Sequence, residues 1–282
     1  MKRIFVTLAG LCLILAAVCM MGGCGEKTDA PAAAEDLKEP VFVKNLISAE
    51  DMDVDISYIS DKSWNKKVKR IEIPGAPKEV SSIVYEDVSE KASGYLLHTV
   101  SWGVAVEPYS ETYFEEHPLE FSELKILWDD GAETMADVGH IAIRSFSVGK
   151  DLEYTRGGAR REAQGMVCHE DLIAKKPVRI VGVELPYEAQ LGRLTDSMTI
   201  NCVPLSKISR EQPLELSEDE ECAVEYLEDV LWENNQPRYG RTFLESQLIY
   251  LDQKGKKHSA MLHLSITPGL MPEDVEGYLS AQ

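Results

Sequence analysis

Positive charge is scarce in this 282-residue sequence, which has 29 Lys and Arg residues against 48 Asp and Glu residues and a formal net charge of −19. A protein that binds the phosphate backbone needs a basic surface, so this composition argues against nucleic-acid binding. Hydrophobic residues are not scarce, at 44% of the chain. That fraction is large enough for a buried core and excludes a disordered acidic tail.

Catalytic and metal-binding motifs are also missing from the sequence. It contains no Gly-x-Ser-x-Gly motif, no P-loop and no dinucleotide-binding glycine pattern. His169-Glu170 begins like the His-Glu-x-x-His helix of zinc proteases, but Ile173 stands where the second histidine is needed. The sequence therefore favours a protein without enzymatic activity, and we expect no cofactor and no bound metal.

A weak calcium site is the one metal hypothesis that the sequence leaves open. Asp51, Asp53 and Asp55 have the spacing of the first three ligands of a calcium-binding loop. The glycine and the twelfth-position glutamate of such a loop are replaced by Ile56 and Lys62. The alternation of these aspartates with apolar residues favours instead a β-strand that has one solvated acidic face.

The one long hydrophobic run lies at the N-terminus. Lys2 and Arg3 precede an uncharged run over residues 4–21, which is the arrangement of a signal peptide. The following residues, Met21-Gly22-Gly23-Cys24, resemble the lipobox of bacterial lipoproteins. This resemblance implies that the signal peptide, residues 1–23, is removed and that Cys24 is acylated, with palmitate among its chains, and becomes the first residue of the mature protein.

A lipidated Cys24 predicts a protein that is anchored to the cell membrane and lies outside the cytoplasm. Two alternatives, a secretory signal cut nearby and an uncleaved anchor helix, give the same location, because the residues before the run are basic. Removal of residues 1–23 leaves 27 basic against 48 acidic residues, a net charge of −21. Such a body is repelled by anionic headgroups, and residues 24–40, which are small, charged and rich in Ala and Pro, are expected to form a flexible tether.

The rest of the sequence contains a faint internal repeat. Residues 124–143 and 248–266 both read as a β-hairpin with a glycine-containing turn, and their histidines, His140 and His263, are 123 positions apart. Upstream, residues 66–74 are echoed by residues 175–186. Short hairpins resemble one another by composition, so duplication and coincidence both remain open.

The repeat, if real, divides the body into two units at 41–148 and 165–282, with a linker or long loop over 149–164. Period-two patterns over 51–58 and 95–106 predict β-strands, and residues 178–185, which are apolar on both faces, predict a central strand. The sequence therefore favours a mainly β fold of two tandem β-sandwich-like (Ig-like) units.

Two segments predict one or two short helices. Ser217 to Glu220 form a capping box, followed by apolar residues at helical spacing, which predicts a helix over about 217–231. Residues 271–279 predict a second helix. Three cysteines follow Cys24. We expect Cys202 and Cys222 to be small buried hydrophobes, a Cys202–Cys222 bridge being the alternative. Residues 168–171 are all metal-ligand types, but consecutive residues point in different directions and no second cluster closes a site, so metal binding is not expected there.

Two groups of residues are candidates for ligand binding. Trp64 and Trp232 lie among polar neighbours and could stack on sugars or anchor a protein, although wedging into the core is the commoner fate of such residues. Arg156, Arg160 and Arg161 form a basic island that could hold a carboxylate or phosphate, although a solvated linker explains them as well.

The sequence thus predicts an envelope lipoprotein with a non-catalytic binding or interaction role. Its expected partners are the membrane, through the lipid anchor, and an envelope protein or surface glycan. The first alternative, a solute-binding lipoprotein of a transporter, is disfavoured because such proteins need two α/β lobes. The second, an enzyme acting on envelope polymers, has no identifiable pair of catalytic carboxylates among so many acidic residues.

Overall fold

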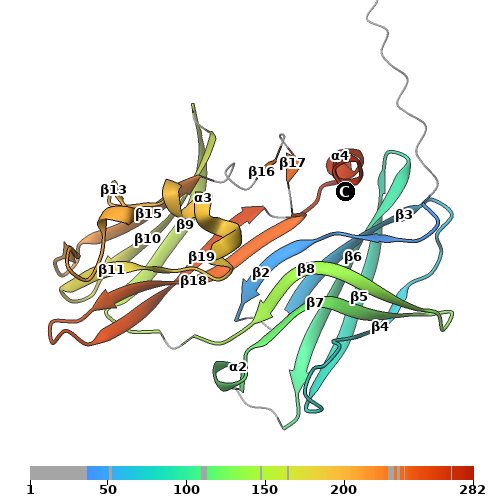
Figure 1. The fold of residues 1–282 in the computed structure, drawn as a ribbon, viewed down its shortest axis with the longest axis horizontal. Helices are drawn as coiled ribbons and strands as arrows, with labels where there is room; N and C mark the ends of the chain where they lie inside the picture. The colour runs from blue at the N-terminus through green and yellow to red at the C-terminus, as the bar shows by residue number, and fades with distance from the viewer. Residues whose placement is uncertain are drawn as a thin grey trace, which may run out of the picture. The chain divides into compact units, whose positions relative to one another are not determined.

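The structure is a computed structural model that describes residues 37–50, 53–108, 113–146, 148–163, 165–227, 232–233, 236–237, 239–267 and 269–282. Residues Asp36–Gln282 form one compact unit, and most of its regular structure is β-strand (Figure 1). The mainly β prediction is confirmed. None of the helices in the described ranges has both the length and the apolar character that a membrane span requires.

A four-stranded antiparallel sheet forms from the first part of the chain. Its strands alternate apolar residues that face the core with polar residues that face outward, as the period of two in the sequence requires. In spatial order they are β1 (Val41–Phe42), β3 (Asp53–Asp61), β6 (Tyr95–Val106) and β5 (Val80–Ala92). The bounds of β6 are those that the sequence predicts.

An eight-stranded sheet, here called the central sheet, takes strands from both halves of the chain (Figure 1). The strand β2 runs parallel to β18 on one side and to β8 on the other, and joins the two halves. The path of the central sheet is β14 (Leu214–Leu216), β11 (Val178–Glu184), β18 (Arg241–Leu251), β2 (Asn45–Ala49), β8 (Glu133–Ile143), β7 (Leu119–Trp128) and β4 (Val68–Glu72), with β19 (Lys257–Thr267) paired to β18.

The remaining strands form a five-stranded sheet and a two-stranded ribbon. The five-stranded sheet has the order β13 (Val203–Pro204), β12 (Thr199–Ile200), β15 (Glu221–Leu227), β10 (Gly165–Ala174) and β9 (Leu152–Glu162). The ribbon pairs β16 (Trp232–Glu233) with β17 (Gln236–Pro237). The described helices are short: α2 (Tyr113–Glu116), α3 (Glu188–Ser197) and α4 (Val275–Ser280), with 3-10 turns η1 (Leu205–Lys207) and η3 (Pro272–Asp274).

Two hydrophobic cores lie between these layers. The first core is enclosed by the four-stranded sheet and β4, β7 and β8, and includes Trp102 and Trp128. The second core is enclosed by the five-stranded sheet, α3 and β11, β18 and β19. Leu46 of β2 belongs to the second core and its neighbour Ile47 to the first, so this one strand contributes to both.

The two halves share a strand arrangement. In the first half β4 pairs with β7, and β7 forms a hairpin with β8; in the second half β11 pairs with β18, and β18 forms a hairpin with β19. In the two hairpins, Leu124 faces Ala136 and Leu248 faces Ala260, all four side chains being in the cores. The hairpins therefore correspond at a separation of 124 residues, one more than the separation of His140 and His263.

The hairpin turns correspond at the same separation. Gly131 donates its N–H to the carbonyl of Trp128, and Gly255 donates its N–H to the carbonyl of Asp252. Both glycines have a left-handed backbone, with φ of 87° and 77°, which a residue with a side chain adopts only at a cost. The two hairpins thus agree in strand order, register and turn position.

The helix expected at 217–231 is wrong over its described residues, because β15 occupies 221–227. The capping-box bond does form, since the Ser217 N–H donates to the Glu220 carboxylate at 2.8 Å. It closes a turn in which Asp219 has φ of 64°, and not a helical turn. Every second side chain of β15, namely Cys222, Val224 and Tyr226, points into the second core. Burial at a period of two therefore outweighs the helical spacing of the apolar residues. The second helix, predicted at 271–279, lies at η3 and α4.

The linker or long loop expected at 149–164 is largely a strand. β9 covers Leu152–Glu162 and pairs with β10 along its length. Gly157 and Gly158 lie within the strand because β10 side chains, Glu170 and His169, pass close over them where no Cβ could fit. The boundary between the two predicted units therefore lies before β9 in the sequence. The central sheet contains strands from both sides of this boundary.

None of the three described cysteines forms a disulfide. Cys168 and Cys222 belong to the second core, and burial raises the pKa of the Cys222 thiol to about 12. Cys202 departs from the prediction of burial: it is exposed, in a turn where its φ is 63°. The strand β12 ends at Ile200, so the apolar alternation does not extend to Cys202.

Candidate functional site

The outward face of the four-stranded sheet carries a row of short polar side chains. The strand β3 buries Val54 and Ile56 in the first core. The side chains that alternate with them, those of Asp53, Asp55 and Ser57, therefore lie on the opposite face. On β6 the positions that pair with Asp55 and Ser57 carry Ser101 and Thr99. Hydroxyl and carboxylate groups therefore adjoin one another across the two strands.

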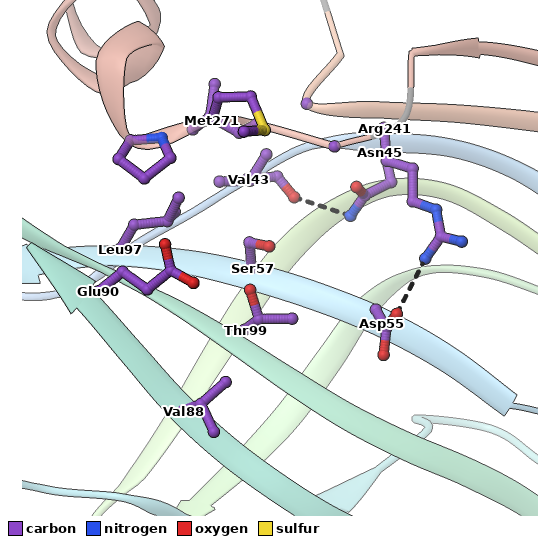
Figure 2. A pocket seen from close by; sticks show the side chains of 14 residues that line it. Val43, Asn45, Asp55, Ser57, Val88, Glu90, Leu97, Thr99, Arg241 and Met271 are labelled. Carbon is purple, nitrogen blue, oxygen red and sulfur yellow. Dashed lines mark hydrogen bonds and ion pairs between the residues drawn. The ribbon is translucent and has the colours of Figure 1, made fainter. Parts of the chain in front are cut away.

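The C-terminal segment encloses part of this face and forms a pocket of about 260 Å³ (Figure 2). Gly269 to Pro272 form one wall, Arg241 of β18 forms another, and β3, β6 and β5 form the floor. Figure 2 shows Ser57 and Thr99 on the floor, with Met271 across the space from them. Val88 and Leu97 provide apolar surface next to the hydroxyl groups.

A separate small cluster of apolar residues holds this C-terminal segment in place. Val275 and Tyr278 of α4 pack, with Leu270, on Ile59 and Leu97 of the sheet. The Tyr278 hydroxyl accepts a hydrogen bond from the backbone N–H of Lys44 at 2.8 Å. The wall of the pocket is thus anchored by burial and by one long-range hydrogen bond. We call these packed residues the C-terminal cluster.

Asp55 is already satisfied by groups of the protein. Its Oδ1 accepts from the Ser101 hydroxyl at 2.6 Å, and its Oδ2 lies 3.3 Å from Nη1 of Arg241 (Figure 2). A carboxylate in this arrangement has little remaining capacity for a metal ion. Asp53 lies next along β3 and accepts from the Tyr85 hydroxyl at 3.0 Å. Asp51, the third calcium candidate, lies outside the described residues, and no group in the described ranges has three or more His, Cys, Asp or Glu residues placed to hold a metal ion.

Three polar groups of the pocket, in contrast, have unused capacity. The hydroxyls of Ser57 and Thr99 and the carboxylate of Glu90 make no side-chain hydrogen bond or ion pair with any other residue in the described part of the chain. They lie within one concave site beside apolar surface. A few convergent polar groups in such a setting are what a small-molecule or chain-end binding site requires.

An exposed aromatic side chain extends the site beyond the pocket. Tyr85 starts on β5, crosses β6 above Gly103 and reaches Asp53 of β3. Two strand spacings, about 9.6 Å, separate β5 from β3, so the side chain must lie along the sheet to span them. A Cβ at position 103 would collide with the Tyr85 hydroxyl, which is why this crossing needs glycine. Tyr85 remains 59% exposed.

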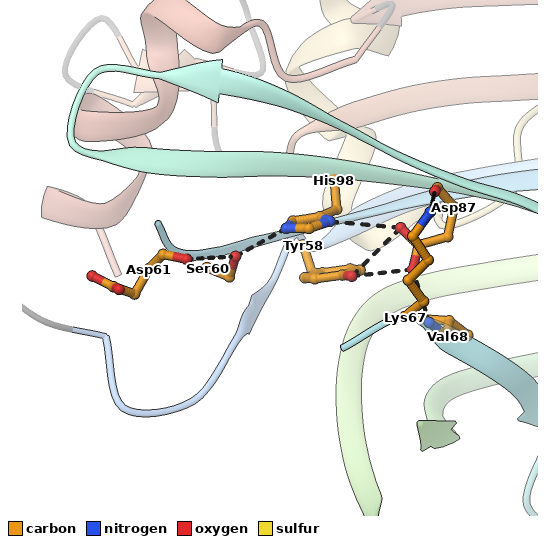
Figure 3. A network of polar contacts seen from close by, with 7 residues as sticks. All are labelled: Tyr58, Ser60, Asp61, Lys67, Val68, Asp87 and His98. Atoms are coloured by element: carbon orange, nitrogen blue, oxygen red, sulfur yellow. Dashed lines mark hydrogen bonds and ion pairs between the residues drawn. The ribbon is translucent and has the colours of Figure 1, made fainter. Parts of the chain in front are cut away.

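A buried polar network on the other face of the same sheet contains serine, histidine and aspartate (Figure 3). Ser60 Oγ is 2.9 Å from Nε2 of His98, and Nδ1 of His98 is 3.6 Å from Oδ1 of Asp87. Ser60 is only 1% exposed, and the His98 ring stacks on Tyr58 at 4.1 Å between centroids. Ser60 and His98 are both buried, and the three pockets described are lined by other residues.

This network has a structural role. Asp87 accepts from the backbone N–H of Val68 at 2.8 Å and from the Tyr58 hydroxyl at 3.2 Å. It thereby ties β5 to β3 and to the start of β4, across the two layers of the first core. Burial, with the nearby Asp87 carboxylate, raises the pKa of Tyr58, so its hydroxyl stays protonated and donates.

A second buried group lies at the edge of the second core. Glu170 is 5% exposed, and the Tyr154 side chain and the His263 backbone N–H both hydrogen-bond to its carboxyl group. Burial raises the pKa of Glu170 to about 7. The His263 ring contacts Tyr154 edge to face, and its Nδ1 is 3.6 Å from Glu245. The zinc-protease-like start at His169-Glu170 thus lies on a strand and brings no second imidazole to the described site.

The binding candidates named from the sequence lie elsewhere. Trp64 is half-buried against the first core: it packs edge to face on Trp128 at 5.1 Å, with Lys66 over its ring at 5.2 Å. Arg156 pairs with Asp171 at 2.7 Å. Arg160 pairs with Glu162 and Glu225, and its neighbour Arg161 is exposed on β9.

The basic island is thus largely neutralised by carboxylates. The side chain of Trp232, the predicted lipidation site Cys24 and the predicted signal peptide, residues 1–23, lie outside the described residues.

Sequence reasoning missed Tyr85, Glu90 and Arg241. The alternation along β3 did predict a polar face there, but not the groups of other elements that join it. No local signal indicates Arg241, which is 186 positions from its partner Asp55.

Comparisons with known proteins add little to this picture. No protein-family model and no curated protein matches the sequence. Among the solved structures that resemble it is a crystal structure of a protein of unknown function from Porphyromonas gingivalis W83, at 8% identity and a TM-score of 0.20. The alignment covers 80% of this chain and 96% of that chain. This likeness is too slight to bear on function.

Proposed function

We propose that this protein is an extracytoplasmic lipoprotein, anchored to the cell membrane through acylated Cys24, that binds an envelope component without catalysis. The observation that carries the binding role is the pocket on the outward face of the four-stranded sheet, with its unused Ser57, Thr99 and Glu90 groups. We call this face, from Tyr85 to Met271, the binding face.

The anchor rests on the lipobox-like Met21-Gly22-Gly23-Cys24 and the run before it. A net charge of −21 on the mature chain and a tether over 24–40 suit a body that is held away from anionic headgroups. A mainly β architecture supports this role over a transporter's solute-binding protein, which needs two lobes of alternating strands and helices.

The finer part of the fold proposal is that the two halves are Ig-like β-sandwich units derived from one ancestral unit. The correspondence of β4, β7 and β8 with β11, β18 and β19 at a constant hairpin separation supports it. In this arrangement the binding face lies on the first unit, where α4 and η3 pack on the four-stranded sheet.

In-cell photo-crosslinking tests the binding role. A photoreactive residue replaces Val88, which is 43% exposed at the pocket, and a control protein carries it at Met135, which is 55% exposed on β8. We expect an envelope component to be captured from position 88 and not from position 135. Equal capture from both positions, or capture from neither, would contradict a binding role for this face.

Metabolic labelling tests the anchor. Cells that express the protein or its Cys24→Ser variant are grown with radioactive palmitate and then fractionated. We expect label and membrane association in the unaltered protein and loss of both in the variant. Label that persists in the Cys24→Ser protein would show that the anchor lies elsewhere.

A further inference from the structure

We infer that the ligand of the binding face is a neutral glycan chain, which lies along the sheet over Tyr85 and reaches into the pocket. This inference rests on the proposed function and adds the chemical class of the ligand. Sugars bind where an apolar ring face meets groups that accept and donate hydrogen bonds to vicinal hydroxyls, and the binding face offers both.

The aromatic part of the site is fixed in orientation. Tyr85 lies along the sheet because Gly103 leaves room beneath it and Asp53 holds its hydroxyl at 3.0 Å. The Tyr85 side chain is 59% exposed in this position, so part of it is open to solvent. A stacking surface that is ordered before binding loses little conformational entropy when a sugar covers it.

The polar part of the site extends from this ring. Asp53, Asp55 and Ser57 follow one another at alternate positions of β3, over about 13 Å of strand. This length exceeds a single sugar ring, so the face suits a chain. At the pocket end Ser57, Thr99 and Glu90 have unused capacity, and Val88 and Met271 supply apolar surface for C–H groups.

The charge pattern separates a neutral glycan from charged ligands. Asp53, Asp55 and Glu90 make the face acidic overall, which disfavours anionic polymers and anionic lipid headgroups. A cationic peptide is less well matched, because Arg241 pairs with Asp55 and Tyr85 donates to Asp53. Within the described part of the chain, Glu90 is then the one pocket carboxylate without a partner. A single carboxylate attracts a cationic peptide only weakly, but it accepts hydrogen bonds well from sugar hydroxyls.

The test uses the detergent-solubilised full-length protein and an array of neutral oligosaccharides, including tetramers of glucose, mannose and N-acetylglucosamine. Polygalacturonate and a lysine-rich peptide are included as charged probes. We expect binding to at least one neutral oligosaccharide, with an affinity that changes little between low and high salt. Binding to polygalacturonate or the peptide alone, or to none of the probes, would overturn the inference.

Three variants locate the binding. Tyr85→Ala should weaken it on the order of tenfold, Tyr85→Phe should weaken it less because the ring is kept, and Met135→Ala should leave it unchanged. Circular dichroism confirms that each variant is folded. Unaltered affinity in a folded Tyr85→Ala protein would also overturn the inference.

The two proposals fail separately. If position 88 crosslinks to an envelope protein and no glycan binds, the binding role stands and the glycan inference is wrong. If position 88 crosslinks to nothing, the binding role itself is wrong.

Discussion

Asp87 is the single residue on which three strands of the first core depend. Its carboxylate accepts from Val68 and Tyr58 and lies 3.6 Å from His98, with its side chain 5% exposed. Loss of the charge in Asp87→Asn should lower the free energy of unfolding by about 2–3 kcal/mol, because buried donors lose a charged acceptor. Urea unfolding followed by tryptophan fluorescence measures it.

The control for this prediction is Glu86→Gln, which removes an exposed charge from the adjacent position of β5. It should change stability by less than about 0.5 kcal/mol. A loss of similar size in both variants would mean that the network contributes nothing specific.

Glu170 predicts a pH dependence of stability. Its pKa is about 7 in the folded protein, whereas an unfolded glutamate titrates near its ordinary value of 4.5. Between these values the unfolded chain releases a proton that the folded protein keeps, so this group lowers stability as the pH rises. The groups that face it, Tyr154, His263 and Asp171, remain in a Glu170→Gln variant.

Between about pH 5 and about pH 8, the free energy of unfolding of the unaltered protein should fall by on the order of 2 kcal/mol relative to that of Glu170→Gln. This loss is smaller than the full pKa shift would give, because nearby solvent screens the charge. The pKa of His263 is also raised, chiefly by Glu245, so the stability that this group contributes falls as the pH rises in both proteins. Glu153→Gln, at an exposed position of β9, should follow the unaltered protein. Parallel pH curves for the unaltered and Glu170→Gln proteins would refute this prediction.

At the scale of elements, patterns of period two predicted the strands well where burial alternates strictly. The bounds of β6 are the predicted ones, and β3, β11 and both long hairpins lie where the sequence indicates. The prediction failed at β15, where a genuine capping bond at Ser217 closes a turn and the second core selects a strand. It failed again at β9, because the two glycines that suggested a loop are required by side chains of β10. In both cases a contact distant in sequence decides the local structure.

The helix α4 is an element whose packing can be tested separately from the main cores. Val275 is fully buried in the C-terminal cluster, and this cluster is distinct from the two cores. In Val275→Asp an unpaired charge would be buried there, so α4 should detach and proteases should cut the segment around Gly269–Pro272 much faster. Limited proteolysis with mass spectrometry measures the cleavage.

The same variant should lose the binding face while much of the β-structure persists, because Met271 and Pro272 form the pocket wall. Glu276→Gln, at an exposed position of α4, is the control and should be cut at the original rate. Unchanged proteolysis in Val275→Asp would show that α4 does not depend on this cluster.

At the scale of the whole molecule, the binding face shows why sequence reasoning reached only part of the site. The sequence favoured a solvated acidic strand face for the aspartates of β3 and assigned no ligand to it beyond a weak calcium alternative. The groups that change this assignment come from β5, β18 and the C-terminal segment, and only the fold brings Tyr85, Arg241 and Met271 to one face. The faint repeat was visible, although its register became clear only from the pairing of Leu124 with Ala136 and of Leu248 with Ala260.

The two cores are joined through β2 and β18, which predicts that they unfold together. Leu46 and Ile47 are adjacent on β2 and lie in different cores, so one core cannot lose β2 without exposing apolar surface of the other. Tryptophan fluorescence reports on the first core through Trp102 and Trp128. Thiol labelling of Cys222 reports on the second core, in a Cys202→Ser background that removes the exposed thiol.

The two signals should change over the same range of urea concentration. In Leu46→Ala, which removes buried atoms from the second core, both midpoints should shift downward together by an amount that corresponds to about 2–4 kcal/mol. Lys254→Ala, at an exposed turn position, should shift neither. If Cys222 becomes reactive well before the tryptophan signal changes, the halves are independent domains, and the parallel pairing of β2 with β18 does not couple them.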